Sequence, residues 1–228
     1  MVTGAGKGIG RATAEAIARA GGQVVLAART ASEIDDVAAG IQRDGGNATA
    51  VPADVGRAAD VERLFALASR VGPPTALVCA AAVLHKVAFD QTTAETWEET
   101  IRVNLTGTFL CCRQAFKVMR EAGGGRIVNL ASLSGVYGTE KFPGLAAYNV
   151  SKYGVVGLTE AVALEGRPHA ITAISLSPGA VDTDLLRRAN PTLRAGLTPK
   201  DVAELIVSLL DGAMVPASGA NIPLFSNA

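Results

Sequence analysis

Near its start the chain reads Thr3-Gly4-Ala5-Gly6-Lys7-Gly8-Ile9-Gly10, and an amphipathic, helix-forming stretch follows directly. Glycines allow a close backbone approach, and the free N–H groups at the start of a helix bind phosphate. We interpret this stretch as a phosphate-binding turn at the head of an α/β fold. Its spacing differs from the usual Gly-x-Gly-x-x-Gly fingerprint, and a glycine turn alone is a weak signal in a chain with 25 glycines. The interpretation therefore depends on the rest of the chain.

Beyond this turn, short apolar runs alternate with helix-forming stretches. Runs that are almost entirely apolar are typical of parallel strands covered by helices on both faces. The expected strands are residues 23–28, 48–51, 76–79, 126–130, 172–176 and 220–224. The expected helices are residues 9–20, 31–40, 60–69, 95–104, 108–122, 147–165 and 199–210. This order predicts a doubly wound parallel sheet with three α/β/α layers, in a single domain over residues 1–228.

The first strand is unusually short in this prediction. Only Met1 and Val2 precede the glycine turn, where a full strand is normal. Either the given start is truncated, or the sheet tolerates a stub strand at its centre.

Composition argues against several classes of protein. Lys plus Arg number 21 and Asp plus Glu also number 21, so there is no excess positive charge for nucleic acid or an anionic membrane. No apolar run reaches the length of a bilayer span, and the first residues lack the pattern of a signal peptide. We expect a cytoplasmic protein without a nucleic-acid or membrane partner. Its cysteines, expected as reduced and packed thiols, are Cys79, Cys111 and Cys112.

The strand at residues 23–28 ends in Ala28 and is followed by Arg29. An acidic residue at such a strand end accepts the ribose hydroxyls of NAD, whereas a cation favours the 2′-phosphate of NADP. Lys7 adds a second positive charge, so NADP(H) is preferred over NAD(H) as the cofactor. The alternative is that Arg29 and Lys7 are ordinary surface cations. Asp54 either accepts the adenine amino group or caps the next helix.

Tyr148 and Lys152 are four residues apart in the expected helix 147–165, and this spacing puts them on one face. A nearby ammonium stabilises a phenolate, so Lys152 would lower the pKa of Tyr148 toward the working range; the alternative is a chance pair. Ser132 follows a strand end, where ligands bind in open α/β sheets, and would bond the reacting oxygen. Ser134 is its rival, and a turn-forming role is the alternative for both serines.

Together these motifs resemble the short-chain dehydrogenase/reductase family. The chain also carries Val103-Asn104-Leu105 and Ser177-Pro178-Gly179 in the family's order and approximate spacing, and the similarity covers residues 1 to about 210. The resemblance implies a Rossmann-type fold with strand order 3-2-1-4-5-6-7. It also implies an oxidoreductase that interconverts a small-molecule alcohol and a ketone or aldehyde by hydride transfer at the nicotinamide C4.

The resemblance assigns a catalytic role to four residues. The residue matching Tyr148 gives a proton to the carbonyl oxygen in reduction and removes one in oxidation. The match to Lys152 bonds the nicotinamide ribose and lowers the phenol pKa, and Ser132 positions the substrate oxygen. Asn104 matches a residue that holds a water in a proton relay to the lysine, and the alternative is an ordinary helix-terminal asparagine. The expected cofactor contacts are Gly4, Lys7, Gly8, Ile9, Gly10, Arg29, Asp54, Val55, Tyr148, Lys152, Pro178, Gly179, Val181 and Thr183.

The chain departs from the family's pattern in several places. Cys79-Ala80-Ala81-Ala82 replaces the family's Asn-Asn-Ala-Gly, which either loosens the floor of the site or is offset by the packing of small residues. Residues 139–142 form an inserted loop that would line the substrate mouth. The substrate-covering segment, residues 183–198, is short. Its leucines (Leu185, Leu186, Leu193) would offer apolar contact, and its arginines (Arg187, Arg188, Arg194) are expected to face solvent.

A homodimer or homotetramer is expected, because the helices that hold Cys111 and Val155 carry apolar residues on more than one face. A tetramer is less assured, since residues 220–225 depart from the family's usual C-terminus. No metal site is expected at His85 or His169, which lack ligand neighbours at metal-binding spacing. The alternative function is a catalytically weak nucleotide-binding regulator or scaffold with the same fold. An epimerase or dehydratase is disfavoured by the short chain.

Overall fold

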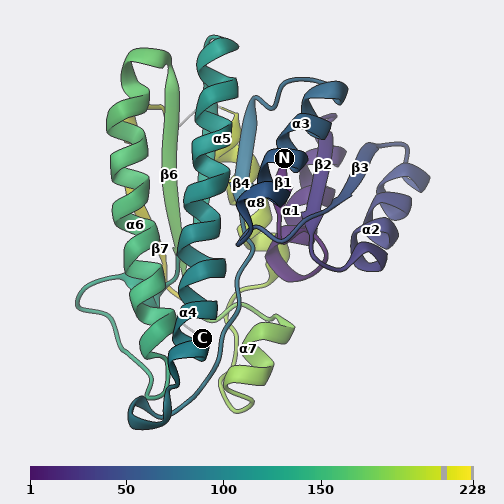
Figure 1. Cartoon of the computed structure of the whole chain (residues 1–228). Helices are drawn as coiled ribbons and strands as arrows, with labels where there is room; N and C mark the ends of the chain where they lie inside the picture. The colour runs from purple at the N-terminus through teal and green to yellow at the C-terminus, as the bar shows by residue number, and fades with distance from the viewer. Residues whose placement is uncertain (212–214, 227–228) are drawn as a thin grey trace.

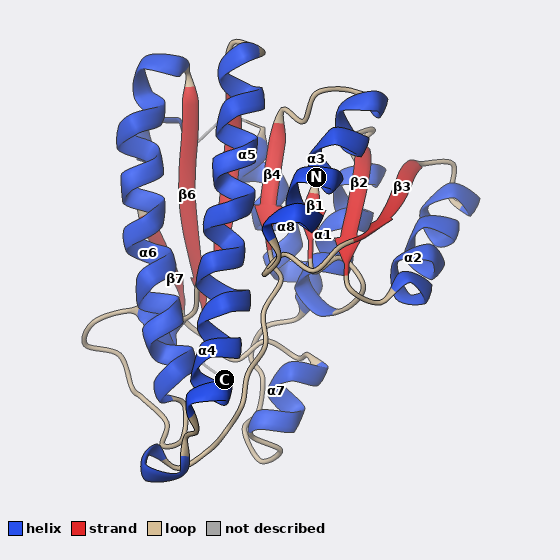
Figure 2. Cartoon of the chain, in the orientation of Figure 1, coloured by secondary structure: helices blue, strands red, loops and turns tan. Residues whose placement is uncertain are grey.

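The computed structural model describes residues 1–211 and 215–226, which form a central sheet flanked by helices (Figures 1 and 2). The sheet has seven strands in the order β3-β2-β1-β4-β5-β6-β7, and every neighbouring pair is parallel. The expected strand order and doubly wound sheet are confirmed. The strands are β1 (Val2–Thr3), β2 (Gln23–Ala28), β3 (Asn47–Pro52), β4 (Ala76–Cys79), β5 (Gly125–Leu130), β6 (Ile171–Pro178) and β7 (Asn221–Leu224). The single-domain prediction over residues 1–228 includes residues 212–214 and 227–228, which lie outside the described residues.

Helices cover both faces of the sheet and give the expected three layers. The α-helices are α1 (Gly8–Arg19), α2 (Ala31–Arg43), α3 (Ala58–Val71), α4 (Ala94–Ile101), α5 (Gly107–Glu121), α6 (Ala146–Gly166), α7 (Asp184–Ala189) and α8 (Pro199–Leu210). Successive side chains of a strand point to opposite faces. In β2, Val24 and Leu26 therefore pack in the core with α1, α2 and α8. Val25 and Ala27 pack in the other core, with α3, α5 and α6.

The first strand is a stub at the centre of the sheet. Val2 pairs with Leu26 of β2 on one side and with Val78 of β4 on the other. Its side chain is fully buried. The stub is therefore paired with a parallel strand on each side.

The two expected helices at residues 95–104 and 108–122 form one continuous helical segment. Between α4 and α5 the backbone makes a π-helical turn over Arg102–Thr106, so the gap expected at residues 105–107 is wrong. Thr108 Oγ1 donates to the carbonyl oxygen of Asn104 at 2.7 Å within this segment. Gly107 serves close packing, because a Cβ there would lie 2.7 Å from Val55 Cγ2.

Helix α7 was not expected from the sequence. Thr183 caps it, because its Oγ1 accepts the N–H of Leu186 at 3.2 Å. Figure 1 shows α7 beyond the edge of the sheet at which the strands end. Within residues 1–211 and 215–226, no helix is long and apolar enough to span a membrane.

Candidate active site

A cavity of about 990 Å³ lies at the ends of β5 and β6. Ligand sites of open α/β sheets lie at this carboxyl edge. The expected site residues that line it are Ile9, Ser132, Tyr148, Lys152, Pro178, Gly179, Val181 and Thr183. Ser134 also lines the cavity, so the choice between the two serines stays open. The expected residues that do not line it are Gly4, Lys7, Gly8, Gly10, Arg29, Asp54, Val55 and Asn104.

Tyr148 and Lys152 share one face of α6 and one site. Lys152 Nζ is 5.5 Å from the centre of the Tyr148 ring. The ammonium donates a hydrogen bond to the carbonyl oxygen of Leu130 at 2.7 Å. The Lys152 side chain is buried, with 3% of the residue exposed. The spacing therefore predicted the meeting of the two polar groups correctly.

Burial shifts the pKa values of both groups. It raises the pKa of Tyr148 to about 12, while the hydroxyl of Ser132 acts in the opposite direction and is the smaller cause. Burial lowers the pKa of Lys152 to about 8. The expected lowering of the phenol pKa by Lys152 does not prevail within this chain, because the loss of water around the phenol outweighs it. At neutral pH the phenol therefore carries its proton and the lysine its charge.

Ser132 begins the turn after β5. Its Oγ accepts the N–H of Ser134 at 3.1 Å, so the hydroxyl stabilises its own turn. The same hydroxyl acts on Tyr148. The turn-forming and substrate-facing interpretations are thus compatible.

A lysine that the sequence analysis did not single out holds the loop beyond Ser132. Lys141 Nζ donates to the carbonyl oxygens of Leu133 at 2.9 Å and Val136 at 2.6 Å, and to Thr139 Oγ1 at 2.6 Å. Thr139, Glu140 and Phe142 line the cavity. The inserted loop therefore lines the cavity, and its place at the substrate mouth stays a prediction.

Asn104 lies in the π-helical turn and is fully buried. Its Oδ1 accepts the N–H of Val83 at 2.8 Å, and its Nδ2 donates to the Val83 carbonyl oxygen at 2.9 Å and to Ser151 Oγ at 3.1 Å. The helix-terminal alternative is wrong, because the helical backbone continues past this residue. Asn104 instead joins the segment after β4 to α6, and Oδ1 keeps one acceptor position.

The segment that replaces the family's asparagines is held by Thr3. Thr3 Oγ1 accepts the N–H groups of Ala80 at 3.2 Å and Ala81 at 3.4 Å. The segment also packs tightly on the glycine turn, since a Cβ on Gly4 would lie 2.7 Å from Ala81 N. Close packing of small residues and this hydroxyl therefore hold the segment in place. The sequence offered no signal for Thr3 beyond its place in the turn.

The glycine turn fits a phosphate-bearing cofactor. Gly4 and Gly8 have φ values of 66° and 54°, and a Cβ on Gly10 would lie 2.2 Å from the Gly4 carbonyl oxygen. Gly8 faces Thr183, and a Cβ on Gly8 would lie 3.2 Å from Thr183 Cγ2. In the described part of the chain, no side chain caps the N–H groups that begin α1. These donors can bind an anion.

The two cations expected at the 2′-phosphate each have an acidic neighbour. Lys7 Nζ is 2.7 Å from Glu33 Oε1, and Arg29 Nη1 is 4.0 Å from Glu99 Oε1. Both cations are more than half exposed. The tertiary contacts bring acidic residues to them that the sequence analysis missed.

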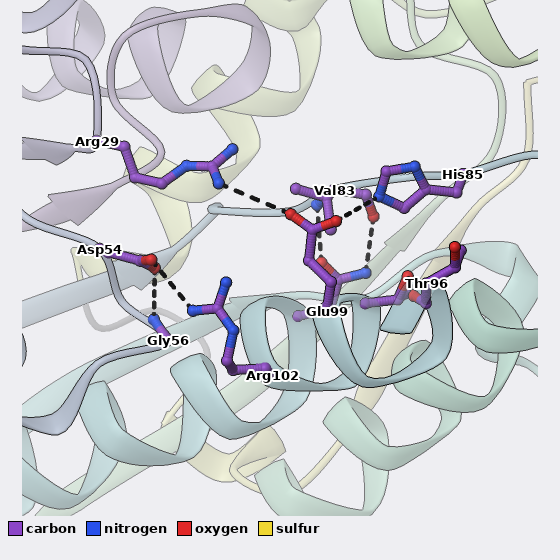
Figure 3. Close-up of polar contacts among 10 residues, drawn as sticks. Arg29, Asp54, Gly56, Val83, His85, Thr96, Glu99 and Arg102 are labelled. Carbon is purple, nitrogen blue, oxygen red and sulfur yellow. Dashed lines mark hydrogen bonds and ion pairs between the residues drawn. The ribbon is translucent and has the colours of Figure 1, made fainter. Parts of the chain in front are cut away.

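Asp54 forms contacts of its own with Gly56 and Arg102 (Figure 3). Its Oδ1 accepts the N–H of Gly56 at 2.9 Å, and its Oδ2 accepts from Arg102 at 3.1 Å. The helix-capping alternative is wrong, because α3 begins at Ala58 and the N–H that Asp54 binds belongs to the preceding turn.

The expected substrate-covering segment, residues 183–198, forms part of the cavity wall. Its leucines line the cavity, and so does Arg194. Arg194 is exposed, as expected, and also lines the cavity. Arg187 instead bonds Asp182, and Asp184 at 2.7 Å.

The histidines and cysteines were also compared with the side-chain groups that bind metal ions. Across the described residues, no group of three or more His, Cys, Asp or Glu side chains could hold a metal ion. His85 has a carboxylate neighbour after all, since its Nε2 is 3.0 Å from Glu99 Oε2. The buried cysteines are free.

The chain is similar in sequence to known proteins over most of its length. The chain matches the family described as short chain dehydrogenase over residues 1–194. It is 36% identical over 216 residues to a 3-oxoacyl-[acyl-carrier-protein] reductase of Synechocystis sp., covering 90% of this chain and 86% of that protein. It is 32% identical to a D-threitol dehydrogenase of Mycolicibacterium smegmatis, covering 97% of this chain and 89% of that protein.

A solved structure from Beutenbergia cavernae is similar over nearly the whole chain. It is described as a candidate NAD(P)-dependent gluconate 5-dehydrogenase and holds NADP at low occupancy. The TM-score is 0.91 at 31% identity, and the match covers 99% of this chain and 94% of that one.

Proposed function

The chain belongs to the short-chain dehydrogenase family, and on that basis we propose that it interconverts an alcohol and a ketone or aldehyde, with Tyr148 as general acid and base. The observation that carries this proposal is the meeting of Ser132, Tyr148 and Lys152 in one cavity at the carboxyl edge of the sheet. The catalytically weak regulator or scaffold has less support, because the chain keeps all of the expected proton-transfer residues.

Each polar residue of the site has a distinct role in this proposal. A nicotinamide cofactor supplies or accepts the hydride when bound. Tyr148 carries its proton at neutral pH, with a pKa of about 12, and donates it to a carbonyl oxygen that Ser132 orients. Lys152, with a pKa of about 8, stays charged and favours the phenolate that is left. Asn104 braces Val83 and Ser151 beside the site, and its open acceptor position suits the expected water.

We propose NADP(H) in preference to NAD(H). The glycine turn and the start of α1 would hold the pyrophosphate, and Arg29 and Lys7 would bind the 2′-phosphate. Ala28 leaves no carboxylate at the end of β2 to accept ribose hydroxyls. Changing Arg29 to Asp should weaken NADPH binding more than NADH binding, and an unchanged preference would remove Arg29 from the phosphate site.

The proposed substrate is a small carbonyl compound or alcohol with an apolar body. Leucine and phenylalanine side chains supply much of the wall beyond Tyr148, and the charged residues of the lining other than Lys152 are Lys86, Glu140 and Arg194. Apolar walls with a few polar groups are typical of small-molecule sites.

A substrate screen tests the proposed reaction. Aldehydes, ketones and the matching alcohols would be offered with NADPH or NADP, and with NADH or NAD, while nicotinamide absorbance is followed. We expect turnover with at least one carbonyl class, faster with NADPH. Enhanced NADPH fluorescence on binding, without oxidation across the whole panel, would favour the regulator or scaffold instead.

We also propose a homodimer or homotetramer in which α5 and α6 pack against a second copy. Phe109 on α5 and Val150, Tyr153 and Leu164 on α6 are between 41% and 67% exposed, which is the apolar surface that such a contact needs. Light scattering after gel filtration gives the mass, and a monomer would contradict this proposal. The cytoplasmic location stays a prediction.

A further inference from the structure

A chain of polar contacts links three elements beside the expected 2′-phosphate site (Figure 3). Arg29 follows β2, and its Nη1 is 4.0 Å from Oε1 of Glu99 on α4. The other carboxylate oxygen, Oε2, is 3.0 Å from Nε2 of His85, in the segment after β4. In Figure 3, Glu99 lies between the other two side chains, which approach it from opposite sides.

We propose that Glu99 is a cofactor-specificity residue, which holds Arg29 in an ion pair and competes with the 2′-phosphate of NADP(H) for the same guanidinium. This inference rests on the proposed function, in which Arg29 receives that phosphate. NADH carries no 2′-phosphate, so the competition weakens the binding of NADPH and leaves that of NADH unchanged. Glu99 therefore limits how strongly the chain prefers NADPH.

The Arg29–Glu99 pair is built to be displaced. Its partners are 4.0 Å apart and their side chains are 55% and 39% exposed, so water screens their attraction. A phosphate offers the guanidinium shorter, paired hydrogen bonds. When Arg29 turns to the phosphate, Glu99 keeps its contact with His85, and its carboxylate is not left without a partner.

Two neighbouring cations, Lys7 and Arg102, lie closer to their acidic partners than Arg29 lies to Glu99. Lys7 is 2.7 Å from Glu33, and Arg102 is 3.1 Å from Asp54. Of these three ion pairs, the one with Arg29 is the longest. Glu99 is thus, of these three acidic residues, the one that holds its cation least closely.

Binding measurements on four variants test the inference. Dissociation constants for NADPH and NADH would be measured from nicotinamide fluorescence for Glu99→Gln, Glu98→Gln, Arg29→Gln and the double variant of Arg29 and Glu99. Glu98 is the matched control, since it is exposed on the same helix and forms no ion pair within the described residues. Circular dichroism checks that each variant is folded.

We expect Glu99→Gln to tighten NADPH binding about threefold, as exposed ion pairs contribute modestly, and to leave NADH binding unchanged. Glu98→Gln should change neither. Arg29→Gln should weaken NADPH binding, and adding Glu99→Gln to it should restore nothing. If Arg29→Gln weakens NADPH binding but Glu99→Gln behaves like Glu98→Gln, the inference fails and the proposed function stands. If Arg29→Gln leaves NADPH binding unchanged, the proposed 2′-phosphate site fails, and the inference with it.

Discussion

Replacing Lys152 with methionine should make the folded protein more stable at neutral pH while removing its activity. Lys152 is 3% exposed, and burial lowers its pKa from 10.5 to about 8. One pH unit of difference in pKa corresponds to about 1.4 kcal/mol, so holding the charge in this site costs about 3 kcal/mol. Methionine cannot donate a hydrogen bond to the Leu130 carbonyl oxygen, which Lys152 does at 2.7 Å, and losing this bond costs the variant about 2 kcal/mol. Methionine has a similar helix propensity and no charge, so we expect a net gain of about 1 kcal/mol.

The difference in free energy of unfolding between wild type and Lys152→Met should also change with pH. Between pH 8 and 10.5 the unfolded chain keeps a proton on Lys152 that the folded chain has lost. The wild-type free energy of unfolding therefore rises through this window relative to that of the variant, by up to about 3 kcal/mol. Groups away from the site titrate alike in both proteins and cancel in the comparison, and Tyr148, with a pKa of about 12, keeps its proton up to pH 10.

Urea unfolding followed by circular dichroism, at one fixed protein concentration, measures both quantities. The control is Lys117→Met, which changes an exposed lysine of α5 and should shift the free energy of unfolding by less than about 0.5 kcal/mol at every pH. The reasoning is refuted if Lys152→Met destabilises the protein by more than about 1 kcal/mol at pH 7 and the difference does not change up to pH 10.

Three further predictions concern the glycine turn, the inserted loop at residues 139–142 and Tyr148. Gly10→Ala should lower the free energy of unfolding by about 1–3 kcal/mol and weaken NADPH binding, because a Cβ would lie 2.2 Å from the Gly4 carbonyl oxygen. Thermal unfolding and fluorescence titration measure the two effects, and no change in either would contradict the close packing. Lys141→Met removes the bonds to the loop carbonyls, including that of Leu133, and should raise KM more than it lowers kcat in steady-state kinetics; an unchanged KM would mean that the loop does not shape the substrate site. Because the pKa of Tyr148 is about 12, alcohol oxidation should accelerate from pH 7 to 10 while carbonyl reduction does not; an oxidation rate that falls with pH would contradict the phenol as the base.

The fold could be predicted from the sequence because its strands are buried on both faces. Runs such as residues 76–79 are wholly apolar, and their alternation with helices allows few topologies. The π-helical turn at Arg102–Thr106 could not be predicted, since it depends on where Asn104 meets Val83 in three dimensions. Helix α7 was missed because it is short and stabilised chiefly by one cap.

The candidate site was predictable where spacing along the chain decides contact. Tyr148 and Lys152 share a helix face, so their meeting follows from the sequence. The pKa of Tyr148 depends on burial by the whole fold, and the sequence analysis overestimated the effect of the lysine. The Arg29–Glu99 pair joins residues far apart in the chain, and no local pattern predicts such a contact.

Replacing Tyr148 with phenylalanine separates proton transfer from cofactor binding. Turnover and NADPH binding would be measured for wild type and Tyr148→Phe with the best substrate of the carbonyl screen. Loss of general acid catalysis should reduce turnover about a hundredfold or more, while the NADPH dissociation constant stays within about twofold, because the phenyl ring keeps its place in the site. A variant that keeps more than about a tenth of wild-type turnover would contradict the account.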